Sequence, residues 1–318
     1  MDYILIIVWF FILIKCAWYL VDWSTNIAKK FGISNLVIGL TIVAIWTSAP
    51  EIFINTISSI KWETWLALWN IVWSNIANIL LILWVSSIIY PLKAQNSTVF
   101  KEVPFALIIS FALFFLAHDI FLSDSSSNII SFWDSLTLML FFIIFLSYTF
   151  WIMRTLEEEQ EEHSHKLTTL KSTIFIIWWI IWLALWAEVI VRASKSIASS
   201  FWISETIIWL TVVAIWTSLP ELATSIIASL KKNTDIVIWN IVWSNIINIV
   251  IWLSVAWLIT PIHINNSDIM YIYIELFVTT ILMLFLYVWN IKWKLNRLHW
   301  VIFIILYILY LVYIWTQL

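Results

Sequence analysis

The sequence contains two glycines and one cysteine among its 318 residues, and only 11% of its residues are charged. The single cysteine, Cys16, excludes an intramolecular disulfide and gives no metal-binding spacing. The formal net charge is −3 and no basic patch occurs, so nothing indicates a nucleic-acid partner. The informative residues are therefore the apolar ones and the few polar groups placed among them.

Long apolar runs extend along the whole chain. Hydrophobic residues make up 63% of it and the mean hydropathy is +0.99. Runs of about 18 or more apolar residues predict membrane-spanning helices, so we expect an all-α polytopic membrane protein embedded in a lipid bilayer. Ten spans are predicted: about 3–22, 36–60, 64–89, 103–121, 129–153, 172–192, 206–230, 234–258, 270–289 and 298–316.

Two segments recur at an offset of 170 residues, which carries position 39 to 209 and position 69 to 239. Residues 39–51 read GLTIVAIWTSAPE and residues 209–221 read WLTVVAIWTSLPE. Residues 69–80 read WNIVWSNIANIL and residues 239–250 read WNIVWSNIINIV. One duplication thus relates residues 1–153 to residues 172–318. Because each half has five spans, an odd number, the two copies are predicted to be inverted five-helix repeats.

The loop 154–171 joins the two halves and is expected to be cytoplasmic. Lys and Arg gather on its side of the predicted spans, whereas only Lys61, Arg192 and Lys195 fall on the other side. Both termini are then expected outside a plasma (cell inner) membrane. Residues 157–165 read EEEQEEHSH, which we interpret as a solvated linker, with a cation or pH sensor as the alternative.

Each copy places a carboxylate and several neutral oxygen donors inside apolar spans. A helix brings Thr47, Ser48 and Glu51 to one side, and Pro50 bends the chain and frees backbone carbonyls. Ser74 and Asn78 share a face of the next span. The second copy repeats these residues as Thr217, Ser218, Pro220, Glu221, Ser244 and Asn248.

This set of residues predicts a cation site. Ser, Thr and Asn often only join membrane helices, but a buried carboxylate without a basic partner is costly and usually functional. All the donors are oxygens, as hard cations require, and two glutamates balance the charge of one Ca²⁺. No resident cofactor is expected; the ions are cargo.

Tryptophan occupies positions where glycine is expected. The chain has 26 Trp, and both of its glycines, Gly32 and Gly39, align with a tryptophan of the other copy, Trp202 and Trp209. Glycine allows membrane helices to approach closely, whereas an indole adds bulk. Our hypothesis is that most of these codons are UGA read as glycine in the cell. An ordinary protein with interfacial Trp belts is the alternative.

The four repeated segments resemble the two α-repeats of the calcium/cation antiporter superfamily, especially the prokaryotic sodium/calcium exchangers. That family has glycine where Trp46, Trp69, Trp73, Trp216, Trp239 and Trp243 stand. The resemblance implies alternating-access exchange of Ca²⁺ for Na⁺. It makes Glu51 and Glu221 the calcium ligands, assisted by the carbonyls of Thr47 and Thr217. It places sodium at Ser48, Ser74, Ser218 and Ser244, with Asn78 beside the centre. Asn248 departs from the pattern, since some members have aspartate there.

Other functions stay open at this point. A Ca²⁺/H⁺ or other cation/H⁺ antiporter on the same fold is the first alternative, because glutamates also carry protons. An intramembrane enzyme is remote, since the sequence has no HExxH motif and no Ser–His or Asp–Asp pair placed by the repeat. The sequence is silent on protein partners.

Overall fold

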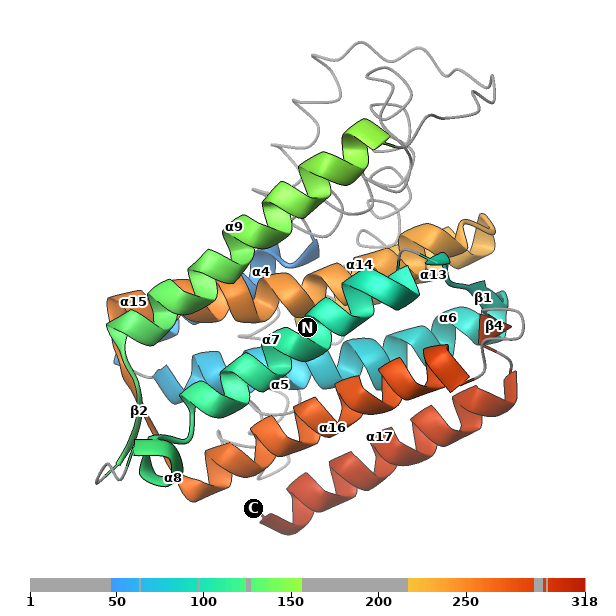
Figure 1. Ribbon diagram of the computed structural model, residues 1–318. Helices are drawn as coiled ribbons and strands as arrows, with labels where there is room; N and C mark the ends of the chain where they lie inside the picture. Colours follow the sequence, from blue (N-terminus) through green and yellow to red (C-terminus); the bar gives the residue numbers. More distant parts are fainter. Residues whose placement is uncertain are drawn as a thin grey trace, which may run out of the picture.

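The computed structural model describes residues 47–62, 64–96, 98–123, 127–155, 217–288, 294–295 and 297–317. In this part of the chain helices dominate and run side by side as one bundle (Figure 1). The predicted first and sixth spans, residues 156–171 of the predicted loop, and Trp46 and Trp216 lie outside the described residues.

The first half contains a helical hairpin followed by two further long helices. Its elements are α4 (Ala49–Ile60), α5 (Thr64–Ala77), the π-helical turn η2 (Asn78–Ile82), α6 (Leu83–Ile89), β1 (Leu92–Lys93), the π-helical turn η3 (Thr98–Glu102), α7 (Val103–Leu116), α8 (Asp119–Ser123), β2 (Asn128–Ile130) and α9 (Phe132–Thr155). The chain continues as helix from α5 through η2 to the end of α6.

The second half follows the same order from its second span. Its elements are α13 (Leu219–Leu230), α14 (Thr234–Ile247), the π-helical turn η5 (Asn248–Leu253), α15 (Ser254–Ile259), β3 (Ile262–Ile264), α16 (Asn266–Val288), β4 (Lys294–Leu295) and α17 (Arg297–Gln317). Both π-helical turns in the middle of long helices begin at equivalent asparagines, Asn78 and Asn248. Such turns are rare and often occur at functional sites.

Five described helices are long and apolar enough to cross a membrane: Thr64–Ile89, Thr98–Leu116, Phe132–Thr149, Thr234–Ile259 and Asp268–Leu286. The two repeated helices are 78% and 89% buried, against 22–39% for the other three, so they form the centre of the bundle. The predicted span 103–121 is shifted, because helix begins already at Thr98 and α7 ends at Leu116, before the short helix α8.

Two short antiparallel ribbons were not predicted from the sequence. In one, Leu92 of β1 pairs with Leu295 of β4; in the other, Asn128 of β2 pairs with Ile264 of β3. Figure 1 shows β1 and β4 at one end of the bundle and β2 at the other. Strands β1 and β3 begin at positions 92 and 262, which the 170-residue offset relates. Equivalent segments of the two copies therefore lie at opposite ends of the bundle.

Several indoles are buried between the central helices. Trp73, Trp239, Trp243, Trp252 and Trp257 are all buried, and none of their ring N–H groups has a hydrogen-bond partner in the part of the chain that the structure describes. The ring of Trp69 lies with its centroid 3.6 Å from that of Tyr271 at 54°, closer than the roughly 4.5–7 Å that aromatic pairs prefer. This close contact is at Trp69, whereas the ring centroids of Trp73 and Tyr310 lie 5.3 Å apart and those of Trp243 and Phe145 lie 4.5 Å apart, both within the usual range.

Candidate functional site

Each predicted glutamate lies in the first turn of a helix whose second residue is proline. Ser218 has φ −81° and ψ 0°, and α13 starts directly after it with Pro220 at its N-terminus. Glu221 follows in the first turn, and Glu51 has the same place in α4. Both glutamates are fully buried. A helix N-terminus carries a partial positive charge, so it is a favourable place for a buried carboxylate.

The neighbouring helices direct a row of polar side chains toward these glutamates. In α5 and η2 the row is Asn70, Ser74 and Asn78, spaced four residues apart and therefore on one helix face. In α14 and η5 the row is Asn240, Ser244 and Asn248. All six side chains are buried, so each must find polar partners inside the bundle.

Serine hydroxyls join the two copies at the glutamates. Ser48 Oγ donates to Glu221 Oε1 at 2.9 Å and lies 3.1 Å from Ser244 Oγ. Ser74 Oγ donates to Glu51 Oε1 at 3.1 Å and accepts from Ser218 Oγ at 3.1 Å. The Ser–Ser contacts exchange with one another under the 170-residue offset, so the polar cluster is nearly two-fold symmetric.

The threonines bridge the copies in the same way. Thr47 Oγ1 donates to Asn240 Oδ1, and Thr217 Oγ1 donates to Asn70 Oδ1, both at 3.2 Å. Thr217 also interacts with Glu51, and Thr47 with Glu221. Each half of the cluster is therefore held by groups of the other half.

Asparagines that the sequence analysis did not select hold α5 and α14 together. Asn75 Nδ2 donates to the backbone oxygen of Asn245 at 3.3 Å, and Asn245 Nδ2 donates to that of Asn75 at 3.1 Å. Their own amide oxygens accept from Asn248 Nδ2 at 3.0 Å and Asn78 Nδ2 at 2.9 Å. The motif letters SNIANI and SNIINI contain all four, but only the assembled pair reveals their function as a brace.

Among the described residues, four buried oxygens in this cluster have no hydrogen-bond donor: Oε2 of Glu51, Oε2 of Glu221, Oδ1 of Asn78 and Oδ1 of Asn248. The two glutamates interact electrostatically and so repel each other when both are charged. Within the described residues no group of three or more His, Cys, Asp and Glu side chains gathers, so the other donors here are neutral oxygens. Bare carboxylate and carboxamide oxygens are suitable ligands for a hard cation.

All ten residues selected from the sequence thus lie in one buried polar cluster: Thr47, Ser48, Glu51, Ser74, Asn78, Thr217, Ser218, Glu221, Ser244 and Asn248. Two further buried glutamates, Glu102 and Glu275, were not selected. Glu102 accepts a hydrogen bond from Tyr148 of α9. Each is a single carboxylate in an apolar helix without an equivalent in the other copy, so the repeat gave no signal for it.

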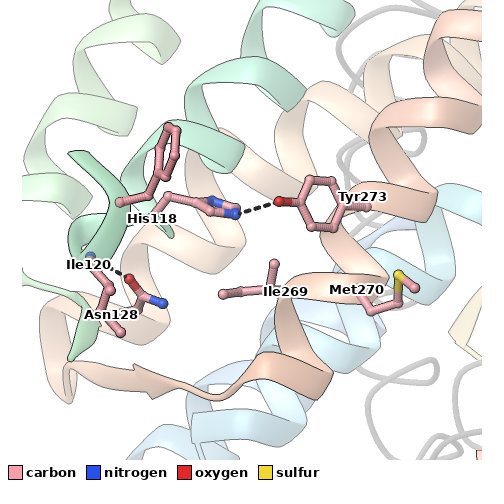
Figure 2. Close-up of a pocket in the computed structure, with 7 residues that line it drawn as sticks. His118, Ile120, Asn128, Ile269, Met270 and Tyr273 are labelled. Atoms are coloured by element: carbon pink, nitrogen blue, oxygen red, sulfur yellow. Dashed lines mark hydrogen bonds between the residues drawn. The ribbon is translucent and has the colours of Figure 1, made fainter.

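A separate cavity of about 390 Å³ lies beside α7, α8 and α16, and its lining is apolar apart from His118, Asn128 and Tyr273 (Figure 2). His118 Nε2 lies 3.0 Å from Tyr273 Oη, and its Nδ1 lies 2.6 Å from the carbonyl of Phe114. None of the ten selected residues lines this cavity. The oxygen ligands suited to a cation therefore lie in the central cluster and not in this cavity.

An apolar helical bundle with a buried oxygen cluster defines an integral membrane protein of the cation-transporting class. Comparison with known families gives the assignment: residues 1–151 and 171–316 match the model of the sodium/calcium exchanger protein family, and the chain belongs to that family. It is thereby a membrane antiporter for Ca²⁺ and a second cation.

Individual relatives agree with this assignment. The chain is 31% identical to the inner membrane protein YrbG of Escherichia coli over 82% of this chain and 81% of that protein. It is 24% identical to the sodium/calcium exchanger MaX1 of Methanosarcina acetivorans, covering 96% of each chain. A structure of the sodium-calcium exchanger NCX_Mj, soaked with Na⁺ and Sr²⁺, superposes with a TM-score of 0.76 at 29% identity, covering 98% of this chain and 99% of that one.

Proposed function

We propose that this protein exchanges Ca²⁺ for Na⁺ across the plasma membrane by alternating access. The observation that carries the proposal is the pair Glu51 and Glu221, one from each copy, each with one carboxylate oxygen hydrogen-bonded and the other bare. Two carboxylates balance the charge of one Ca²⁺, and nearby carboxamide and hydroxyl oxygens complete an oxygen-only ligand set.

The ten residues have distinct roles in this proposal. Glu51 and Glu221 bind Ca²⁺, with the backbone carbonyls of Thr47 and Thr217 beside them. The four serines of the cluster contribute to sodium binding. Asn78 and Asn248 supply neutral oxygens near the centre, and both have a bare Oδ1.

The proposed architecture has ten membrane helices, arranged as an inverted repeat of residues 1–153 and 172–318 around a cytoplasmic loop 154–171. The two antiparallel ribbons support an inverted arrangement, because the related strands β1 and β3 lie at opposite ends of the bundle. Inverted repeats allow the same site to face either side of the membrane in turn. Both termini are proposed to lie outside.

Coupling follows from competition for the same oxygens. Na⁺ and Ca²⁺ both need Glu51 and Glu221, so binding of one ion opposes binding of the other. When no ion is bound, the two buried carboxylates repel each other, which disfavours closing the empty site. We therefore expect coupled exchange of Na⁺ and Ca²⁺ rather than an uncoupled leak of either ion.

Radiocalcium uptake into proteoliposomes tests this function directly. The protein is made with glycine in place of the tryptophans that we expect to be recoded, and it is reconstituted into the proteoliposomes. An outward sodium gradient is imposed, and uptake is compared with that of the Glu51→Gln and Glu221→Gln variants. We expect sodium-driven uptake that both substitutions abolish. Well-folded protein without sodium-driven uptake would reject the Na⁺/Ca²⁺ assignment.

A second candidate is exchange of Ca²⁺ for protons. It is favoured by the neutral carboxamides at Asn78 and Asn248, which leave the central cluster with only two carboxylates. Each of these carboxylates also has an oxygen able to accept a proton. Ca²⁺ uptake driven by a pH gradient in sodium-free buffer would establish this alternative.

A further inference from the structure

Glu275 is a third buried carboxylate next to the central cluster. It lies in the middle of α16 and is 1% exposed. Its Oε1 accepts three hydrogen bonds: from Ser110 Oγ at 3.0 Å, from Thr279 Oγ1 at 3.1 Å and from Asn75 Nδ2 at 3.4 Å. Its Oε2 accepts none from the residues that the structure describes. One oxygen is therefore saturated by neutral donors while the other stays bare.

No positive charge faces Glu275 from the part of the chain that the structure describes. Its three partners are neutral, and the α5, α7 and η2 sequences contain no charged residue. The other charged or titratable groups on the remaining elements packed against α16, and on α16 itself, are Lys101, Glu102, Lys294, Asp268, Tyr271, Tyr273 and Tyr287. An isolated buried carboxylate is very costly, so its stable form has a bound cation.

A chain of hydrogen bonds connects Glu275 with the central cluster. Asn75, which donates to Glu275, accepts from Asn248 Nδ2 at 3.0 Å. Asn248 Nδ2 also donates to Ser74 Oγ at 3.4 Å, and Ser74 donates to Glu51. A change at Glu275 therefore reaches the candidate ligand Asn248 through Asn75 alone, and it reaches Glu51 through Asn75, Asn248 and Ser74.

The duplication shows that this arrangement is not a packing element common to both copies. The position equivalent to Glu275 is 105, which is Phe105, and Phe105 stacks on Phe145. Asn245, the equivalent of Asn75, has no such carboxylate among its hydrogen-bond partners in the described residues. Glu275 thus adds one negative charge to one side only of a nearly symmetric cluster.

We propose that Glu275 Oε2 is a further cation-binding position that takes a monovalent cation, a proton or Na⁺, and that Asn75 transmits its occupancy to the central cluster. One carboxylate among neutral groups suits a single positive charge, whereas Ca²⁺ usually takes six to eight oxygens. The coupling to Ca²⁺ exchange rests on the proposed function; the cation position itself does not.

Infrared difference spectroscopy tests the position without Ca²⁺. Spectra of reconstituted protein are recorded between low and high pH in sodium-free buffer, and between sodium-free and sodium-containing buffer. We expect a carboxyl band that responds and is lost in Glu275→Gln, which keeps the shape and hydrogen-bonding oxygen but removes the charge. A pH response identifies a proton and a sodium response identifies Na⁺. Glu275→Asp should shift the band. This second variant provides the test if the Gln variant fails to fold.

The coupling is tested by calcium affinity. In the native protein, calcium affinity should fall with the concentration of the cation that binds Glu275. In Glu275→Gln this fall should be less steep. For each tenfold rise in the concentration of that cation, the native protein should lose about ten times more calcium affinity than the variant, because the variant binds one competing cation fewer. Thr279→Val, which removes one donor to Glu275 but no charge, should retain the native steepness of this fall and shift only the cation concentration at which it occurs.

The outcomes separate the two proposals. If no band assigned to Glu275 responds to pH or sodium while Ca²⁺ binds normally, the cation position is rejected and the proposed function stands. If the band responds but Ca²⁺ is not transported, the function is rejected and the position stands. An unchanged cation dependence of calcium affinity in a folded Gln variant rejects the coupling.

Discussion

Ser48 Oγ donates a 2.9 Å hydrogen bond to Glu221 Oε1, and so joins the first copy of the repeat to the carboxylate of the second. The bond leaves Oε2 of Glu221 as the bare oxygen of that carboxylate. The equivalent Ser218 donates instead to Ser74, which in turn donates to Glu51. Both glutamates thus accept a serine hydrogen bond, but Ser48 bonds to Glu221 directly, whereas its equivalent Ser218 reaches Glu51 only through Ser74.

This difference predicts unequal effects of two equivalent substitutions. Ser48→Ala removes a hydrogen bond to a charged group, an interaction of about 1.5–3 kcal/mol. It should raise the Ca²⁺ concentration for half-maximal uptake by about tenfold or more. Ser218→Ala removes a bond between two hydroxyls and should have a smaller effect. Calcium-dependent uptake by the two variants, reconstituted in parallel, measures the difference; equal effects would contradict the assigned geometry.

The asparagine brace predicts a loss of stability rather than of ion specificity. Asn245→Ala leaves the backbone oxygen of Asn75 and the amide of Asn78 without their partners in the buried core. Orphaned buried groups cost about 1–3 kcal/mol each, so we expect the two together to cost roughly 2–6 kcal/mol. Thermal unfolding in detergent should show a clearly lower midpoint. Asn96→Ala, at an exposed residue, is the control and should leave the midpoint unchanged.

The sequence predicted the central cluster well because the duplication acts as an internal comparison. A spacing of four residues places Ser74 and Asn78 on one face of a helix, and the second copy repeats it as Ser244 and Asn248. Ser48 and Ser218 instead directly precede α4 and α13, and for them the repeated motif was the signal. Helices occupy the described parts of the predicted spans that contain these residues. Such local periodicity can be read before any tertiary contact is known.

Features that depend on a partner across the bundle could not be predicted in this way. Asn75 lies only one residue after Ser74, about 100° around the helix, and acts through the backbone of Asn245. The ribbons pair strands of two or three residues that are distant in sequence. Glu275 has phenylalanine as its equivalent, so repetition gave no hint of it. In each case the relevant contact forms only when the two halves meet.

The inverted arrangement predicts opposite accessibility of two equivalent positions. Lys93 of β1 and His263 of β3 are both exposed and are related by the 170-residue offset. In a Cys16→Ser background, a membrane-impermeant maleimide added outside intact cells should label His263→Cys but not Lys93→Cys. Permeabilised cells provide the control, in which both positions are labelled. Labelling of both from the same side would refute the inverted repeat.

The last prediction concerns tryptophan at a position with left-handed backbone. Trp62 has φ 64° directly after the end of α4, and its equivalent Lys232 has φ 61° after α13. This is the helix-terminating position that favours glycine, because other residues pay roughly 1–2 kcal/mol there. The buried indoles, whose N–H groups lack partners, add a second reason to expect glycine at Trp73, Trp239 and Trp243.

We therefore expect UGA codons at positions 62, 73, 239 and 243 in the gene, and glycine at these positions in peptides of the native protein analysed by mass spectrometry. Trp62→Gly should raise the unfolding midpoint of protein expressed with tryptophan, since it removes a left-handed penalty at an exposed residue that makes no buried contact to lose. Lys232→Gly is the matched control, with the same backbone and a comparable expected gain. UGG codons at these positions, or tryptophan in the native peptides, would show that the indoles are genuine.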